Sequence, residues 1–126
     1  HNRVIEAVKN LPPHYKLVLF SVYLLGKADV NCTITGDIYE VYCEICGETG
    51  FAPLTQRRVS SLVNELDASG LLNARVVSMG RYGRTKKIRL GVSRSLIKDI
   101  FSSDDRFGRL IGYVPKCLPK PPSSRS

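Results

Sequence analysis

The chain has 126 residues, of which 43% are hydrophobic, enough to bury the core of one soluble domain. It contains no apolar run long enough to cross a bilayer and no recognisable signal peptide. We therefore expect a cytoplasmic protein with no membrane partner. Because the chain begins at His1 without Met, a fragment of a longer protein stays an open alternative.

The net charge of +8 is unevenly distributed along the chain. Residues 51–91 hold eight basic and two acidic residues, whereas residues 14–50 hold two basic and five acidic ones. A localised basic field attracts polyanions such as nucleic acid. Charge alone does not separate this interpretation from a solvated, solubilising surface.

Two helices are predicted in the first 25 residues. Residues 3–11 place apolar side chains at helical spacing, and the following prolines can start a new helix. Residues 14–25 are apolar almost all round, which is typical of a helix buried on several sides, and Gly26 is its predicted stop.

A short strand at residues 33–35 and a helix over residues 37–48 are expected next. The helix has an apolar stripe on one side and Glu40, Glu44 and Glu48 on another. Because that acidic face repels phosphate, this helix should support a nucleic-acid interface without touching it.

The next helix is the candidate recognition helix. Thr55 is a suitable N-cap, and the helix should run to about Ser69, with Gly70 as its stop. At 100° per residue, Arg57, Ser61 and Asn64 fall on the side opposite the apolar stripe. An Arg, a hydroxyl and an amide can hydrogen-bond to base edges and phosphates. An ordinary solvated surface helix would show a similar pattern.

Residues 71–79 and 86–92 show the alternation of apolar side chains that predicts strands. A basic tip with two glycines joins them. Arginines on a thin loop suit a narrow minor groove, where the negative potential is deepest. A solvated turn with Tyr82 folded back on the sheet is the alternative. A last helix is predicted over residues 93–101, and residues 111–126 form a proline-rich tail that we expect to be disordered.

The sequence disfavours disulfide bonds, metal binding and catalysis. The four cysteines show no disulfide framework, so reduced thiols are expected. Cys43 and Cys46 lie inside a predicted helix without a second pair of ligands, so a buried Cys46 and a partly exposed Cys43 are favoured over a zinc site. His14 has no nucleophile or carboxylate beside it by motif. No phosphate-binding loop, nucleophile elbow or HExxH motif is present, so no catalytic residue is expected.

Three blocks together resemble a known family. They are LPPHYKLVL at residues 11–19, GDIYEVYCEICGETGFAPLTQRRVSSLVNEL at residues 36–66 and GRYGRTKKIRL at residues 80–90. They are similar to the C-terminal winged-helix domain of the archaeal origin-recognition and cell-division-control replication initiators. The resemblance covers residues 3–101 and leaves the tail after Arg109 unmatched.

The resemblance implies a winged helix-turn-helix fold, mainly α with a small antiparallel β wing, over residues 1–110. It implies binding of duplex origin DNA, with the recognition helix in the major groove and the wing in the minor groove. Carried onto this chain, the DNA-binding positions are Gln56, Arg57, Arg58, Ser61, Asn64, Arg81, Tyr82, Arg84, Thr85, Lys86 and Lys87.

The resemblance also implies an AAA+ ATPase module upstream in the full-length protein. ATP or ADP and Mg²⁺ would belong to that module, and no cofactor is expected in this chain. Other initiator protomers and the replicative helicase are further candidate partners, and a nucleoid-associated location would follow. Two alternatives remain: a winged-helix transcription regulator, and a protein-docking winged helix that uses the apolar helix at 15–25 or the Glu40/Glu44 face.

Overall fold

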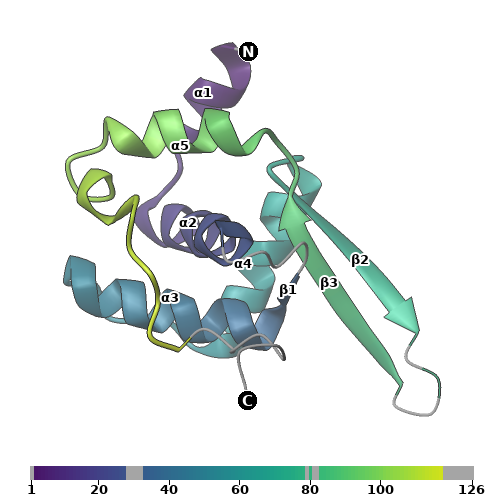
Figure 1. Cartoon of the computed structure of the whole chain (residues 1–126). Helices are drawn as coiled ribbons and strands as arrows, with labels where there is room; N and C mark the ends of the chain where they lie inside the picture. Colours follow the sequence, from purple (N-terminus) through teal and green to yellow (C-terminus); the bar gives the residue numbers. More distant parts are fainter. Residues whose placement is uncertain (1, 28–32, 79, 81–82, 118–126) are drawn as a thin grey trace, which may run out of the picture.

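The computed structural model describes residues 2–27, 33–78, 80 and 83–117. The elements in chain order are α1 (Asn2–Lys9), α2 (Pro13–Lys27), β1 (Thr33–Ile34), α3 (Thr35–Thr49), α4 (Gln56–Ala68), β2 (Leu72–Ser78), β3 (Arg84–Leu90), α5 (Arg94–Ser102) and the 3-10 turn η2 (Gly108–Leu110). The helices form one body, from which the β2–β3 hairpin projects (Figure 1). The predicted fold class, mainly helical with an antiparallel wing, is confirmed.

Helix α2 forms the centre of the core. Every side chain from Leu17 to Leu25 is buried, including Ser21, whose hydroxyl donates to the Leu17 carbonyl oxygen at 2.7 Å. α2 contacts α3, α4, α5 and β3, so the apolar side chains on all its faces are used. The prediction of a helix buried on several sides is confirmed. Each large apolar side chain buried in this way contributes about 1.5–3 kcal/mol.

The end of α2 differs from the sequence prediction. Gly26 does not stop the helix, which continues to Lys27. A Cβ on Gly26 would collide with the guanidinium of Arg94. That guanidinium donates to the Tyr23 carbonyl oxygen at 2.9 Å and lies 4.5 Å from the centre of the Tyr23 ring. Glycine at this position leaves space for the guanidinium of an arginine from α5.

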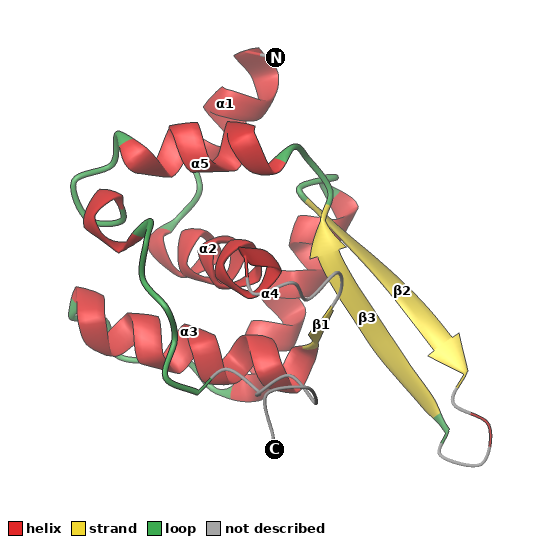
Figure 2. Ribbon diagram, viewed as in Figure 1, coloured by secondary structure: helices red, strands yellow, loops and turns green. Residues whose placement is uncertain are grey.

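The three strands form an antiparallel sheet in the order β1-β3-β2 (Figure 2). Ala74 pairs with Ile88, and Val76 pairs with Lys86. Ile88 is fully buried, whereas Val76 is 58% exposed although it lies on the same face of the sheet as the buried end. The hairpin thus leaves the core partway along its length, and its outer half has no helix beneath it.

Several element boundaries move by one or two residues from those predicted. α3 begins at Thr35 instead of Asp37, which shortens the preceding strand to Thr33–Ile34. β3 begins at Arg84 instead of Lys86, so Arg84 and Thr85 belong to a strand and not to the tip. The backbone pairing of Ser78 with Arg84 extends the ladder beyond the point where the hydrophobic alternation ends.

The segment after α5 packs against the helical body. Phe107 places its ring 5.1 Å from Phe20 and 5.0 Å from Phe101, and all three rings are buried. The prediction of disorder over residues 111–126 is wrong for residues 111–117, while residues 118–126 lie outside the described residues. The carboxylate of Glu44 on α3 accepts hydrogen bonds from the Tyr113 hydroxyl, the Lys116 amide (2.8 Å) and the Cys117 amide (3.2 Å).

Glycine at position 91 is required by a close backbone approach. Its amide donates to the Leu71 carbonyl oxygen at 2.9 Å, and a Cβ there would collide with the carbonyl oxygen of Gly70. We predict that Gly91→Ala lowers the free energy of unfolding by about 1–3 kcal/mol through overpacking. Gly47→Ala is the control, because its Cβ meets no atom and alanine favours a helix by roughly 0.5–1 kcal/mol. Chemical denaturation of both variants measures this, and equal stabilities would contradict it.

The hydrogen bonds at Glu44 predict an acid-dependent stability. Burial alone would raise the pKa of Glu44, but hydrogen bonds from Tyr113, Lys116 and Cys117 outweigh it and lower the pKa below 4.5. The ionised carboxylate therefore stabilises the fold above pH 4.5, and this contribution is lost as the pH falls through the lowered pKa.

We expect Glu44→Gln to lower the free energy of unfolding by on the order of 1 kcal/mol at neutral pH. The free energy of unfolding of this variant should also depend less on pH in the acid range. Amide exchange at Lys116 and Cys117 should also become faster. Glu40→Gln is the matched control, since Glu40 is exposed on the same helix and accepts none of these three hydrogen bonds. If the free energy of unfolding of Glu44→Gln fell with acid pH as it does in the unsubstituted chain, the stabilising role of the Glu44 carboxylate would be contradicted.

Candidate nucleic-acid interface

The turn between α3 and α4 is held by two tyrosines of α3. The Tyr39 hydroxyl donates to the Leu54 carbonyl oxygen at 2.9 Å, and the Leu54 amide donates to the Tyr42 hydroxyl oxygen at 2.9 Å. Tyr42 is fully buried, and burial is the main cause that raises its pKa. Both backbone groups of Leu54 are thereby tied to α3, which fixes the point where α4 starts.

His14 supports the same turn from α2. Its Nδ1 lies 2.8 Å from the Tyr42 hydroxyl oxygen, and its ring packs edge-on against Phe51 at 5.6 Å. Because the Leu54 amide can only donate to Tyr42, the phenolic proton is available to His14 Nδ1. The tautomer of His14 sets which of the two groups donates in this contact. His14 has a structural role in this site, as its lack of a catalytic partner by motif led us to expect.

The helix predicted after Thr55 is present as α4. The Thr55 hydroxyl caps it by accepting the Arg58 amide at 3.3 Å. Val59, Leu62, Val63 and Leu66 form its buried face, while Gln56, Arg57, Arg58, Ser61 and Asn64 are exposed. The apolar spacing read from the sequence therefore separates the two faces correctly. The exposed face presents a run of donors and acceptors near the start of the helix.

The acidic residues of α4 lie towards its other end and are engaged by neighbours. Glu65 accepts a hydrogen bond from the Tyr15 hydroxyl at 2.5 Å, which is the main cause that raises the pKa of Tyr15. Asp67 accepts the Ala74 amide of β2 at 3.0 Å. Both carboxylates thus join α4 to its neighbours, and the first half of the exposed face carries only basic and neutral side chains.

One hydrogen bond joins the exposed face of α4 to the hairpin. Lys86 Nζ of β3 donates to Asn64 Oδ1 at 2.7 Å, between residues 22 positions apart in the sequence. α4 also packs directly against β2. The exposed face of α4 and the α4-facing side of the hairpin therefore form one continuous surface, which we call the helix–wing surface: Gln56, Arg57, Arg58, Ser61, Asn64 and Lys86.

The other predicted DNA-binding positions fall into three groups. Lys87, which is exposed, and Thr85, which is half-buried, lie on the opposite face of β3 from Lys86, because successive strand residues alternate. Arg84 is the first residue of β3. Arg81 and Tyr82 lie outside the described residues, so the predicted roles of these two tip residues stay predictions.

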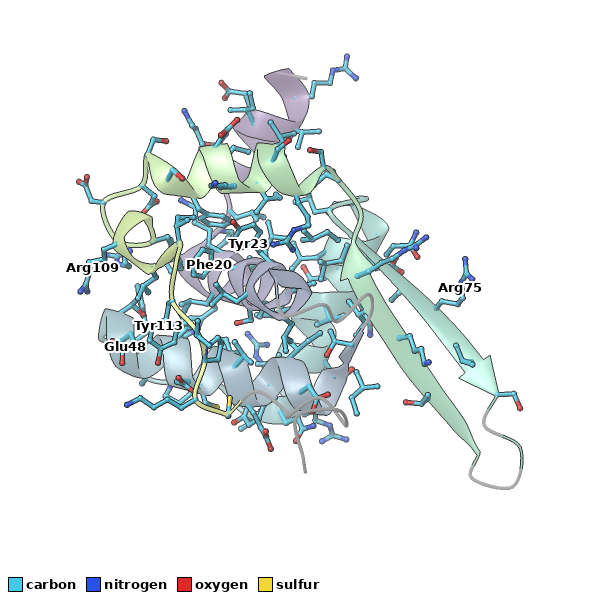
Figure 3. All side chains as sticks on the ribbon, in the orientation of Figure 1. Phe20, Tyr23, Glu48, Arg75, Arg109 and Tyr113 are labelled. Atoms are coloured by element: carbon cyan, nitrogen blue, oxygen red, sulfur yellow. The ribbon has the colours of Figure 1, made fainter. Side chains whose placement is uncertain are left out.

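Two basic residues were missed by the sequence interpretation. Arg75 on β2 and Arg89 on β3 are exposed on the same face of the sheet as Lys87. Figure 3 shows the Arg75 side chain directed away from the helical body. The period of two along each strand was the signal that could have found them, since it places residues 75, 87 and 89 opposite the buried Ile88.

The burial predicted for two of the cysteines is confirmed. Cys46 is fully buried and Cys43 is half-buried, both on α3. Burial is the main cause that raises the pKa of Cys46 to about 11, so its thiol is protonated at neutral pH. Among the described residues no group of three or more potential metal ligands comes together, and none of their helices is long and apolar enough to span a membrane.

Comparison with known proteins identifies the family. Residues 6–100 match the model of the CDC6 C-terminal winged helix domain. The chain is 47% identical over 110 residues to the ORC1-type DNA replication protein 1 of Sulfolobus acidocaldarius, covering 86% of this chain and 28% of that protein. It is 50% identical over 99 residues to the ORC1-type DNA replication protein of Thermococcus onnurineus, covering 79% and 24% respectively.

A solved structure agrees with these sequence matches. The ORC1 protein of Aeropyrum pernix, whose structure was determined in complex with DNA, matches with a TM-score of 0.77 and 41% identity, over 86% of this chain and 28% of that one. These matches define a winged-helix domain. The chain belongs to the CDC6 C-terminal winged helix family, and its relatives are archaeal ORC1-type replication proteins. It spans about a quarter of their length.

Proposed function

We propose that the chain binds duplex DNA at replication origins as the C-terminal module of an archaeal replication initiator. The observation that carries this proposal is the hydrogen bond between Lys86 and Asn64, which makes α4 and the hairpin one surface. The DNA complex of the Aeropyrum pernix relative supports the same function. The net positive charge of residues 51–91 supplies the electrostatic attraction.

In this proposal α4 enters the major groove. A major groove about 12 Å wide accepts a helix, and Arg57, Ser61 and Asn64 present the side-chain groups that read base edges there. The hairpin then reaches the adjacent minor groove with Arg81, Tyr82 and Arg84, while Thr85, Lys86 and Lys87 lie closer to the phosphates. The Thr55 hydroxyl caps α4 by accepting the Arg58 amide, and the side chains of Gln56 and Arg58 are exposed at the start of the helix.

We assign no catalytic step to this chain. The AAA+ ATPase module, with its ATP or ADP and Mg²⁺, is expected in the full-length protein. Because a single small module buries only about 600–1,000 Å² on DNA, we expect modest affinity that the rest of the protein or a second protomer increases. Other initiator protomers and the replicative helicase are proposed as further partners, and a cytoplasmic, nucleoid-associated location follows from the role.

The two alternatives have less support. A docking role for the Glu40/Glu44 face is weakened because Glu44 already binds the segment around Lys116. Helix 15–25 offers no docking surface in this structure, since its apolar side chains from Leu17 to Leu25 are buried. A transcription regulator would share the DNA-binding surface, and stable dimerisation with effector-dependent binding in sedimentation would favour it.

Fluorescence anisotropy with an origin duplex and a scrambled duplex, across a salt series, tests the proposal. With about four to six phosphate contacts, log K should fall with log salt at a slope of roughly −4 to −5. We expect Arg81→Ala/Arg84→Ala to weaken binding to both duplexes and to reduce the slope by about 2. Arg57→Ala should also reduce the preference for the origin duplex if Arg57 contacts bases.

Lys9→Ala/Lys98→Ala is the control for lost charge, because these two exposed lysines lie on α1 and α5. Binding that does not depend on salt, or that responds equally to the control and the wing variant, would contradict the proposed function. It would favour a docking domain instead.

A further inference from the structure

Two arginines of the segment that follows α5 contact the end of α3. Arg109 Nη2 donates to the Glu48 carbonyl oxygen at 3.2 Å, and Figure 3 shows the Arg109 side chain at that end of the helix. The guanidinium of Arg106 lies over the ring of Phe51, 4.8 Å from the ring centre. Both arginines come after residue 100, where the match to the CDC6 C-terminal winged helix domain ends. Their contacts join this later segment to the turn between α3 and α4.

The backbone that carries Arg106 is held by its neighbours in the segment. Asp104 Oδ1 accepts the Arg106 amide at 2.7 Å and the Phe107 amide at 3.1 Å. The other carboxylate oxygen of Asp104 lies 3.9 Å from Nζ of Lys16 on α2. Phe107 itself is buried in the core. Arg106 is therefore an exposed side chain on a backbone that is fixed relative to α2 on both sides of the residue.

Phe51 connects Arg106 to the contacts that hold the start of α4. The half-buried Phe51 ring packs against His14 at 5.6 Å, and His14 Nδ1 lies 2.8 Å from the Tyr42 hydroxyl oxygen. The Leu54 amide donates to that same oxygen, one residue before the α4 cap Thr55. Because only two residues separate Phe51 from Leu54, a shift of the Phe51 ring would also shift the start of α4.

The contact between Arg106 and Phe51 uses the face of the guanidinium in a cation–π interaction. An arginine close to the start of α4 could instead bind a phosphate of the DNA. The two roles differ in their dependence on salt. Loss of a phosphate contact reduces the slope of log K against log salt by about 1, whereas loss of a positioning contact lowers the affinity at an unchanged slope.

We propose that Arg106 is a positioning residue for α4. It holds the Phe51 ring against His14 and so fixes the orientation in which the exposed face of α4 meets DNA. This inference rests on the proposed function and extends it, because it assigns part of the DNA affinity to a residue that does not touch DNA. The segment after α5 is then part of the DNA-binding module.

The first test compares Arg106→Met, Arg106→Lys and Arg3→Met in the 126-residue chain. Arg3 is exposed on α1, so Arg3→Met makes the same chemical change on another element. Fluorescence anisotropy with the origin duplex should show that Arg106→Met binds about two- to fivefold more weakly, which is the strength of an exposed cation–π contact. The salt slope of this variant should equal that of the unsubstituted chain. Arg106→Lys should recover most of the affinity, because an ammonium group can also lie over the ring.

A double-mutant cycle tests whether Arg106 acts through Phe51. Phe51→Leu removes the aromatic ring and keeps an apolar side chain in its place. In a Phe51→Leu chain, Arg106→Met should have no further effect on DNA affinity, because the two residues form one interaction. Losses of affinity that add together in the double variant would contradict the proposed route.

Amide hydrogen exchange measures the positioning in the absence of DNA. The amides of Leu54, Arg58 and Val59 form hydrogen bonds at the start of α4. We expect faster exchange at these three amides in Arg106→Met and unchanged exchange in Arg3→Met. Exchange at Ile88 of β3 should be the same in both variants, because the hairpin does not depend on Arg106.

The outcomes separate this inference from the proposed function. If Arg106→Met reduced the salt slope by about 1, Arg106 would bind a phosphate directly, and the positioning role would be overturned while the proposed function stood. Unchanged DNA affinity in Arg106→Met would have the same meaning. If the unsubstituted chain bound no duplex, the proposed function would be overturned, and faster exchange at the start of α4 in Arg106→Met would still support the positioning contact.

Discussion

The burial of α2 on all sides is the constraint on which the other elements depend. Because every side chain from Leu17 to Leu25 is buried, each neighbouring helix and the sheet must cover one of its faces. This arrangement and the direct packing of α4 against β2 fix α4 and the base of the hairpin relative to one another. Polar contacts then refine the arrangement: Tyr39 and Tyr42 hold the start of α4, and Arg94 closes the end of α2.

Charged side chains have different roles in the helical body and in the hairpin. In the body, carboxylates form hydrogen bonds between elements. Glu44, Glu65 and Asp67 each accept a hydrogen bond from another element. The outer half of the hairpin has no acidic residue and no core beneath it, and Val76 there is 58% exposed. Repulsion between the cross-strand partners Arg75 and Lys87 is a local cost to the stability of the hairpin.

The sequence predicted the parts of this fold that periodicity determines. The two faces of α4, the burial of α2 and the antiparallel hairpin follow from spacing alone, and the resemblance named the family correctly. Gly26 failed as a stop signal because its environment depends on Arg94, which is 68 positions away in the sequence. The segment around Tyr113 appeared disordered because its partner, Glu44, lies on a distant helix whose acidic spacing suggested a solvated face. Arg75 was missed because it lies outside the basic tip, and only the period of two along the strands places it on an exposed face.

The central claim is that α4 and the hairpin act as one surface held by α2. The most direct measurement is an amide chemical-shift titration of the ¹⁵N-labelled chain with an origin duplex. We predict perturbations at residues 56–64 of α4 and along both β2 and β3 that saturate together with one dissociation constant, while Glu40 and Glu48 of α3 remain unperturbed. Separate saturation of α4 and the hairpin, or shifts centred on α3, would contradict a single helix–wing surface.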